Sequence, residues 1–178
     1  LDGATLVDKM PLNSVDAGLI HRLFPDARFL LSLRRPCDVV LSGFMQAFRP
    51  NPAMVQFSTL ADTAALYAQV MDLWRRYARV LPLAVHAVRY EDLVADLEGE
   101  ARRVLTFLDL PWDDTVLEYA ERARGRTIST PSYHQVTRPI YKTSIGRWTR
   151  YRDQLKPLLP LLEPSIQAFG YDVPPGQI

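Results

Sequence analysis

Two short apolar segments, with helical patterns between and after them, constrain this fold more than any other feature of the sequence. Phe29–Leu33 and Leu83–Val88 are apolar-rich runs of the length that is typical of strands buried in a sheet. Strands that alternate with helices predict an α/β domain with a parallel sheet. In such sheets ligands bind at the carboxyl ends of the strands, so the residues that follow each strand carry most of the functional information.

Apolar spacing predicts the other elements. Pro36 suits the first turn of a helix that follows the first strand. Thr5–Met10 is interpreted as the end of a strand, and residues 124–149 show no periodicity. The predicted helices are Ser14–Phe24, Pro36–Phe48, Leu60–Val80, Leu93–Leu108, Asp114–Arg122 and Tyr151–Phe169.

Composition narrows the class of protein. The chain has 178 residues with 48% hydrophobic and 23% charged, which fits one soluble domain over residues 1–178. A net charge of +1 argues against a protein built to coat nucleic acid. The single cysteine, Cys37, excludes an internal disulfide and suits a reducing, cytoplasmic compartment. No apolar run approaches the roughly 20 residues of a membrane span, no signal peptide is visible, and the start without Met indicates a piece of a longer protein.

The first strand is followed by residues suited to hold a phosphate. Arg34 comes directly after the strand, and Ser42 lies about two turns into the next helix on the face of Asp38. A guanidinium beside a helix N-terminus can bind a phosphate through two hydrogen bonds, and a Ser hydroxyl adds a donor. The alternative is an Arg and a Ser that face solvent.

Two further single residues are candidates. Tyr90 follows the second strand, where an aromatic ring can stack on a base, or instead pack against the helix that Asp92 caps. Lys9 precedes Met10 and Pro11 and can face the same cleft, although a lone Lys is ordinarily a solvated surface residue.

Positive charge is concentrated in residues 122–156, which contain nine cations and the single acid Asp153. A cationic, aromatic loop suits a polyanionic nucleotide. The alternatives are a solvated basic face or a patch for RNA or anionic lipid. The cations and the interleaved aromatic residues are Arg122, Arg124, Arg126, Arg138, Lys142, Arg147, Arg150, Arg152, Lys156, Tyr133, Tyr141, Trp148 and Tyr151.

Together these motifs resemble the sulfotransferases that use 3'-phosphoadenosine 5'-phosphosulfate. The block from Arg34 to Ser42 resembles the family's Arg-x-Pro-x-Asp-x-x-x-Ser motif, which implies that both residues bind the 3'-phosphate. Tyr90-Glu91-Asp92-Leu93 is similar to the element whose Tyr contacts adenine. The resemblance implies a P-loop-NTPase-like parallel sheet flanked by helices, and it covers Asp8 to about Lys156.

The stretch 132–140 and Gly146-Arg147-Trp148 look most like the tyrosylprotein sulfotransferase branch and its bacterial relatives. That branch implies donor contacts by Ser132, Gln135, Arg138, Tyr141 and Arg147 and a place for Lys9 near the transferring group. Lys9 and Ser132 are thus the implied catalytic residues, and the other four join Arg34, Ser42 and Tyr90 in binding the nucleotide.

The resemblance also has departures. The tyrosylprotein branch has a further Arg where this chain has Gln46. The family's Gly-rich loop for the 5'-phosphosulfate and its catalytic base lie upstream of every motif seen here. The implied reaction moves sulfonate to a hydroxyl or amine acceptor and requires no metal. The acceptor is not identified, and residues 48–57 are one candidate for contacting it.

Three other interpretations stay open at this point. A P-loop nucleotide kinase-like enzyme requires magnesium and an upstream Gly-x-x-x-x-Gly-Lys-Ser/Thr loop. A non-catalytic module would bind RNA or an acidic polymer through residues 122–156, with a steep salt dependence. An inactive fragment or degenerate relative would keep the motifs without the activity.

Overall fold

A two-stranded parallel sheet lies at the centre of the computed structural model, which describes residues 5–10, 12–46, 48, 51, 54–119 and 142–173. Strand β1 (Arg28–Leu33) pairs with β2 (Ala84–Arg89), in a register that sets Arg28 beside Ala84 and Leu33 beside Arg89. Helices α2 (Pro36–Phe44) and α3 (Leu60–Val80) form the connection between the strands. The predicted α/β fold with a parallel sheet is therefore confirmed.

The two strands end at the same edge of the sheet. After β1 the chain passes through Arg34 and Arg35 and enters α2, where Pro36 occupies the first turn. After β2 it enters α4 (Tyr90–Ala95) without a loop. Because Leu33 and Arg89 are partners in the register, Arg34 and Tyr90 leave the sheet side by side.

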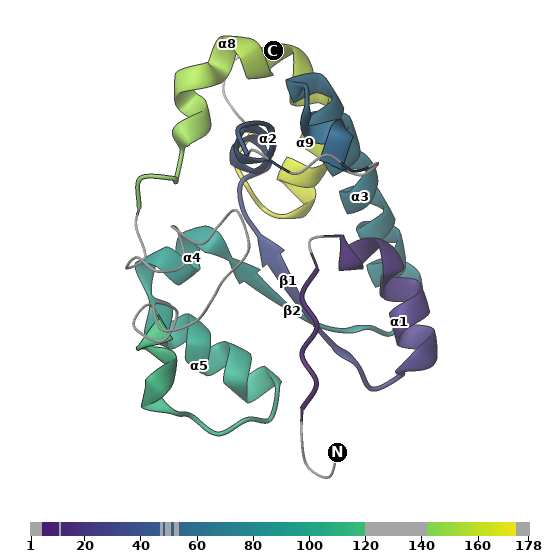
Figure 1. The fold of residues 1–178 in the computed structure, drawn as a ribbon, viewed down its shortest axis with the longest axis vertical. Helices are drawn as coiled ribbons and strands as arrows, with labels where there is room; N and C mark the ends of the chain where they lie inside the picture. Colours follow the sequence, from purple (N-terminus) through teal and green to yellow (C-terminus); the bar gives the residue numbers. More distant parts are fainter. Residues whose placement is uncertain are drawn as a thin grey trace.

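The main core lies beyond this carboxyl edge. Figure 1 shows α2, α3, α8 (Arg152–Leu155) and α9 (Leu159–Ala168) gathered at one end of the molecule, with α2 between the others. The side chains that form this core come from all four helices and from the 3-10 helix η4 (Arg147–Tyr151). They are Cys37, Val40, Leu41, Ala64, Trp148, Leu155, Leu159, Leu162 and Ile166.

Helices also lie on the two sides of the sheet. Helices α4 and α5 (Leu97–Phe107) lie on one side, and α1 (Ala17–Leu23) and α3 lie on the other (Figure 1).

None of the helices in the described ranges is long and apolar enough to cross a bilayer. The remaining short elements are the 3-10 helices η1 (Asn13–Asp16), η2 (Met54–Phe57), η3 (Asp114–Val116) and η5 (Lys156–Leu158).

Several predicted boundaries differ from the structure. The helix expected from Leu93 to Leu108 is two helices, because the Asp96 side chain accepts a hydrogen bond from the Gly99 N–H (2.8 Å) and starts α5. Helix α2 ends at Phe44 rather than near Phe48.

Other expected elements also changed. Of the helix expected at 114–122, the structure has a 3-10 turn at Asp114–Val116, and positions 120–141 lie outside the described residues. Residues 5–10 form no strand. The expected final helix is the succession α8, η5 and α9, in which Pro157 and Pro160 occupy first-turn positions. By contrast α3 has the predicted bounds, because Thr59 Oγ1 accepts from the Asp62 N–H (3.0 Å) and caps it.

Candidate functional site

The guanidinium of Arg34 contacts the ring of Tyr90 at the carboxyl edge of the sheet. The Cζ atom of Arg34 lies 4.9 Å from the ring centroid, within cation–π distance. Both side chains are partly buried. Arg34 was predicted to bind a phosphate and Tyr90 to contact a base, from two separate motifs. The structure brings these two side chains into contact.

Arg34 retains hydrogen-bonding capacity after its protein contacts are counted. Its Nη2 donates to the carbonyl oxygen of Ser144. Its Nε is buried, and no hydrogen-bond partner for it is found among the residues that the structure describes. A guanidinium has five N–H donors and binds phosphate through pairs of them, so this group fits an anionic ligand.

The Gly146-Arg147-Trp148 motif lies against α2 through Asp38. The Asp38 carboxylate is 1% exposed. One oxygen accepts from the Gly146 N–H (2.9 Å) and the other from the Trp148 N–H (2.8 Å). Gly146 has φ +68°, a left-handed conformation that favours glycine. Arg147 stands between the two bonded amides with its side chain exposed.

A second carboxylate links the two strand ends to the C-terminal segment. Glu91 accepts from the Arg35 backbone N–H (3.0 Å) with one oxygen and from the Tyr171 hydroxyl (3.0 Å) with the other. Burial raises the pKa of Tyr171, and the neighbouring Glu91 charge adds to the rise. The phenol therefore stays protonated and donates its hydrogen bond at neutral pH.

Two guanidinium groups lie over the Tyr171 ring. The Cζ atoms of Arg35 and Arg89 are 5.5 and 4.4 Å from its centroid. Arg35 also donates to the Asp172 carbonyl oxygen (2.9 Å), and Arg89 donates to the Phe169 carbonyl oxygen. We call Arg35, Arg89, Glu91 and Tyr171 the strand-end clamp, because they fix the two strand ends from which Arg34 and Tyr90 emerge.

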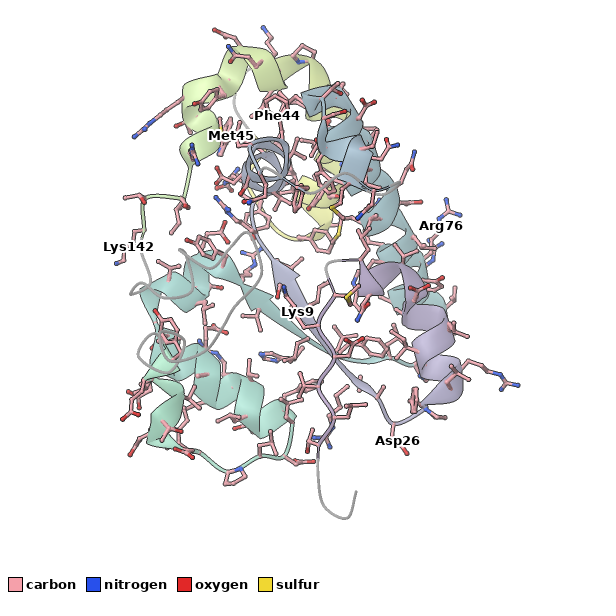
Figure 2. The ribbon with its side chains drawn as sticks, viewed as in Figure 1. Lys9, Asp26, Phe44, Met45, Arg76 and Lys142 are labelled. Carbon is pink, nitrogen blue, oxygen red and sulfur yellow. The ribbon has the colours of Figure 1, made fainter. Side chains whose placement is uncertain are left out.

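Three predicted site residues remain apart from this contact. Arg147, described above, is exposed on η4. Ser42 is exposed on α2, one turn beyond Asp38. Lys9 is exposed on the irregular segment before α1 (Figure 2). The hydrogen bonds and ring contacts of the described residues do not join any of these three side chains to Arg34 or Tyr90. The other predicted site residues, Ser132, Gln135, Arg138 and Tyr141, lie outside the described part of the chain.

An open pocket of about 300 Å³ lies at the end of α2 that carries Phe44. Its lining is mainly apolar, and the rings of Phe48 and Phe57 in it are tilted against each other with centroids 4.8 Å apart. Figure 2 shows Phe44 at this end of α2. The lining residues are Phe44, Gln46, Phe48, Met54, Val55, Phe57 and Ser58.

The described residues also include the cysteine and residue types that bind metals. Burial raises the pKa of the Cys37 thiol to about 11, so it is not a thiolate at neutral pH. Within the described ranges, no group of three or more His, Cys, Asp or Glu side chains is placed to hold a metal ion.

Sequence reasoning gave no role to Asp38, Glu91 or Tyr171. Asp38 carried a usable signal, because it is an acid inside an apolar helix pattern, where burial requires hydrogen-bond partners. Glu91 stood in a motif but was not assigned to the site. Tyr171 had no local signal, since its side-chain contacts are with residues 80 or more positions away.

Comparisons with known proteins agree with the motifs. A model of the sulfotransferase family matches residues 2–114. An uncharacterized protein of Aquifex aeolicus is 30% identical over 166 residues, which are 91% of this chain and 21% of that protein. Protein-tyrosine sulfotransferase A of Caenorhabditis elegans is 27% identical over 180 residues, covering 94% of this chain and 45% of the relative.

A human relative, heparan sulfate glucosamine 3-O-sulfotransferase 6, is 34% identical over 128 residues, 62% of this chain and 36% of the relative. The chain thus spans less than half the length of these three relatives. The sulfotransferase domain from the curacin biosynthetic pathway has a similar fold, with a TM-score of 0.61 at 19% identity, covering 97% of this chain and 65% of that domain. On the family match and these relatives, the chain belongs to the sulfotransferase family.

Proposed function

We propose that the protein transfers a sulfonate group from 3'-phosphoadenosine 5'-phosphosulfate to a hydroxyl or amine acceptor. Family and fold support sulfonyl transfer in general. The observation that supports this donor is the contact between Arg34 and Tyr90. A guanidinium beside an aromatic ring, with a buried N–H that has no partner among the described residues, suits a ligand that carries a phosphate close to a base.

The proposed roles come from the motifs, and the contact between Arg34 and Tyr90 supports the roles of these two residues. Arg34 and Ser42 bind the 3'-phosphate, and Tyr90 contacts the adenine. Arg147 reaches the same phosphate from η4. Lys9 offsets the charge that builds on the bridging oxygen as the nucleotide leaves, and Ser132 hydrogen-bonds near the 5'-phosphate. Gln135, Arg138 and Tyr141 complete the nucleotide contacts.

Transfer follows the logic of phosphoryl transfer. The acceptor atom forms a bond to sulfur as the bond between sulfur and the bridging oxygen breaks, in line, with charge spread over the peripheral oxygens. The protein positions the two substrates and stabilises that charge. Residues 48–57, the segment that the sequence analysis selected for acceptor contacts, supply much of the lining of the apolar pocket at the end of α2, which makes this pocket the proposed place for acceptor contacts among the described residues.

The donor proposal is tested by calorimetric titration with 3'-phosphoadenosine 5'-phosphate and, as a matched control, adenosine 5'-phosphate. The ligand with the 3'-phosphate should bind about 30-fold more tightly or better, because a charge-assisted hydrogen bond contributes about 2 kcal/mol. Equal affinity for the two ligands would contradict the proposal.

Calorimetric titration also tests the alternative, a module that binds polyanions through residues 122–156. That module would bind RNA with an affinity that falls steeply with salt and would be indifferent to the small nucleotide. Five cations in the described part of this segment, Lys142, Arg147, Arg150, Arg152 and Lys156, are exposed. Retained RNA binding in saturating nucleotide would favour the module.

A further inference from the structure

The two proposed phosphate-binding segments lie far apart in the sequence and are tied together by one buried carboxylate. Asp38 belongs to the block from Arg34 to Ser42, and its partners Gly146 and Trp148 flank Arg147, 108 and 110 positions away. The following inference rests on the proposed function and adds a residue to it that binds no ligand itself.

The hydrogen bonds explain why the carboxylate is buried although no basic side chain of the described ranges forms a salt bridge with it. A helix N-terminus leaves backbone N–H groups without intrahelical partners, and a carboxylate satisfies them best because the bonds are charge-assisted. Gly146 is the residue that precedes η4, and Asp38 accepts from it and from the second residue of η4. The start of η4 is thereby fixed to α2.

A second tie lies on the other side of Gly146. Arg34 donates to the Ser144 carbonyl oxygen, two residues before Gly146. The Trp148 ring is buried in the core, with the Arg152 guanidinium 5.6 Å from its centroid. The backbone that carries Arg147 is held on both sides, while its own side chain stays exposed.

We propose that Asp38 is the positioning residue of the donor site: it sets the place of Arg147 relative to Arg34, so that both cations reach the same phosphate. Asp38 does not touch the nucleotide. Its contribution to donor binding passes through Arg147 and is absent when the Arg147 guanidinium is removed.

The test is a double-mutant cycle on the binding of 3'-phosphoadenosine 5'-phosphate, measured by calorimetry. Asp38→Asn replaces one acceptor oxygen by an amide that cannot accept from an N–H, and affinity should fall by about tenfold. Arg147→Ala should weaken binding by a similar factor. Added to Arg147→Ala, Asp38→Asn should cost less than about twofold.

A merely structural role predicts a different pattern. Glu100 is a matched control because it is also a buried acid. It is 7% exposed and accepts a hydrogen bond from Arg103 on α5. Glu100→Gln should lower stability without changing nucleotide affinity. Equal losses from Asp38→Asn with and without Arg147, or no loss at all, would overturn the proposal.

A second variant covers the case in which Asp38→Asn does not fold. Gly146→Ala places a Cβ where no atom of the described residues lies within 4 Å, so the expected cost comes from the left-handed backbone of the same segment. It should weaken nucleotide binding severalfold, and this loss should also vanish in the Arg147→Ala background. An unchanged loss there would overturn the proposal.

If the unaltered protein binds no nucleotide, the proposed function is wrong and this inference is wrong with it. If it binds but the cycle is additive, the inference alone falls.

Discussion

The two ends of β1 each carry arginine, and the two environments differ in a way that separates a structural contact from the proposed binding site. At the amino end, Arg28 forms a salt bridge with Asp109 and donates to the Phe107 carbonyl oxygen (2.9 Å). At the carboxyl end, Arg34 and Arg35 contact carbonyl oxygens and aromatic rings. Among the described residues, no salt bridge with a carboxylate neutralises either of these two.

The difference concerns charge rather than packing alone. Carbonyl oxygens and ring faces orient a guanidinium but leave its net charge in place, whereas a carboxylate cancels it. The carboxyl edge therefore holds oriented guanidinium groups that no salt bridge among the described residues neutralises. This is what an anionic ligand requires, and the amino edge lacks it.

Replacing the ring at the centre of the strand-end clamp should have the largest effect on stability. Tyr171→Ala removes the surface on which Arg35 and Arg89 lie and the hydroxyl that binds Glu91. The free energy of unfolding should fall by about 3 kcal/mol, measured by urea denaturation. A change below about 1 kcal/mol would mean that the clamp does not hold the edge.

Glu91→Gln should have the next largest effect. The amide retains the shape but weakens the bonds to the Arg35 N–H and the Tyr171 hydroxyl, at a cost of about 1.5 kcal/mol in the free energy of unfolding. Glu98→Gln, which alters an exposed pair with Arg102 on α5, should cost less than about 0.5 kcal/mol and serves as the control. Equal effects would remove the distinction between the two environments.

The dependence of protein stability on alkaline pH should report the protonation of Tyr171. Its pKa is raised in the folded protein, so its stabilising contribution is complete below the pKa of the unfolded chain, near 10, and is lost as pH rises toward the folded value. Stability measured above pH 10 should decline less steeply in Tyr171→Phe than in the unaltered protein. Identical slopes would contradict the buried hydrogen bond to Glu91.

The amino edge should respond least. Asp109→Asn removes the salt bridge with Arg28, whose side chains are 37% and 78% exposed, and should change the free energy of unfolding by less than about 1 kcal/mol. Raising the salt concentration should shrink even this effect. A loss of several kcal/mol would show that the two ends of β1 are energetically alike.

The sequence predicted features that depend on local pattern. The strand positions, the bounds of α3 and the placement of Arg34 and Tyr90 at strand ends follow from apolar periodicity and from the rule for parallel sheets. The break between α4 and α5 was missed because a short-range cap at Asp96 interrupts an otherwise continuous helical pattern. Periodicity identifies the buried face and is insensitive to such a cap.

The long-range hydrogen bonds that hold the site together could not be predicted from local sequence patterns. Glu91 bonds to Tyr171 across 80 positions, and Asp38 bonds to the η4 amides across more than 100. Asp and Glu are also common on protein surfaces, so neither residue type predicts burial. The partners are backbone N–H groups or a tyrosine hydroxyl, and no sequence spacing identifies them. Such contacts depend on the tertiary fold that brings α2, α4 and the C-terminal segment together.

The most direct measurement compares the two ends of β1 by titrating 3'-phosphoadenosine 5'-phosphate into Arg34→Ala and Arg28→Ala. Loss of Arg34 should weaken binding by about 30-fold or more, a cost of about 2 kcal/mol, whereas loss of Arg28 should change the dissociation constant by less than about twofold. Unchanged affinity in Arg34→Ala, or an equal loss in both variants, would contradict the assignment of the carboxyl edge as the nucleotide site.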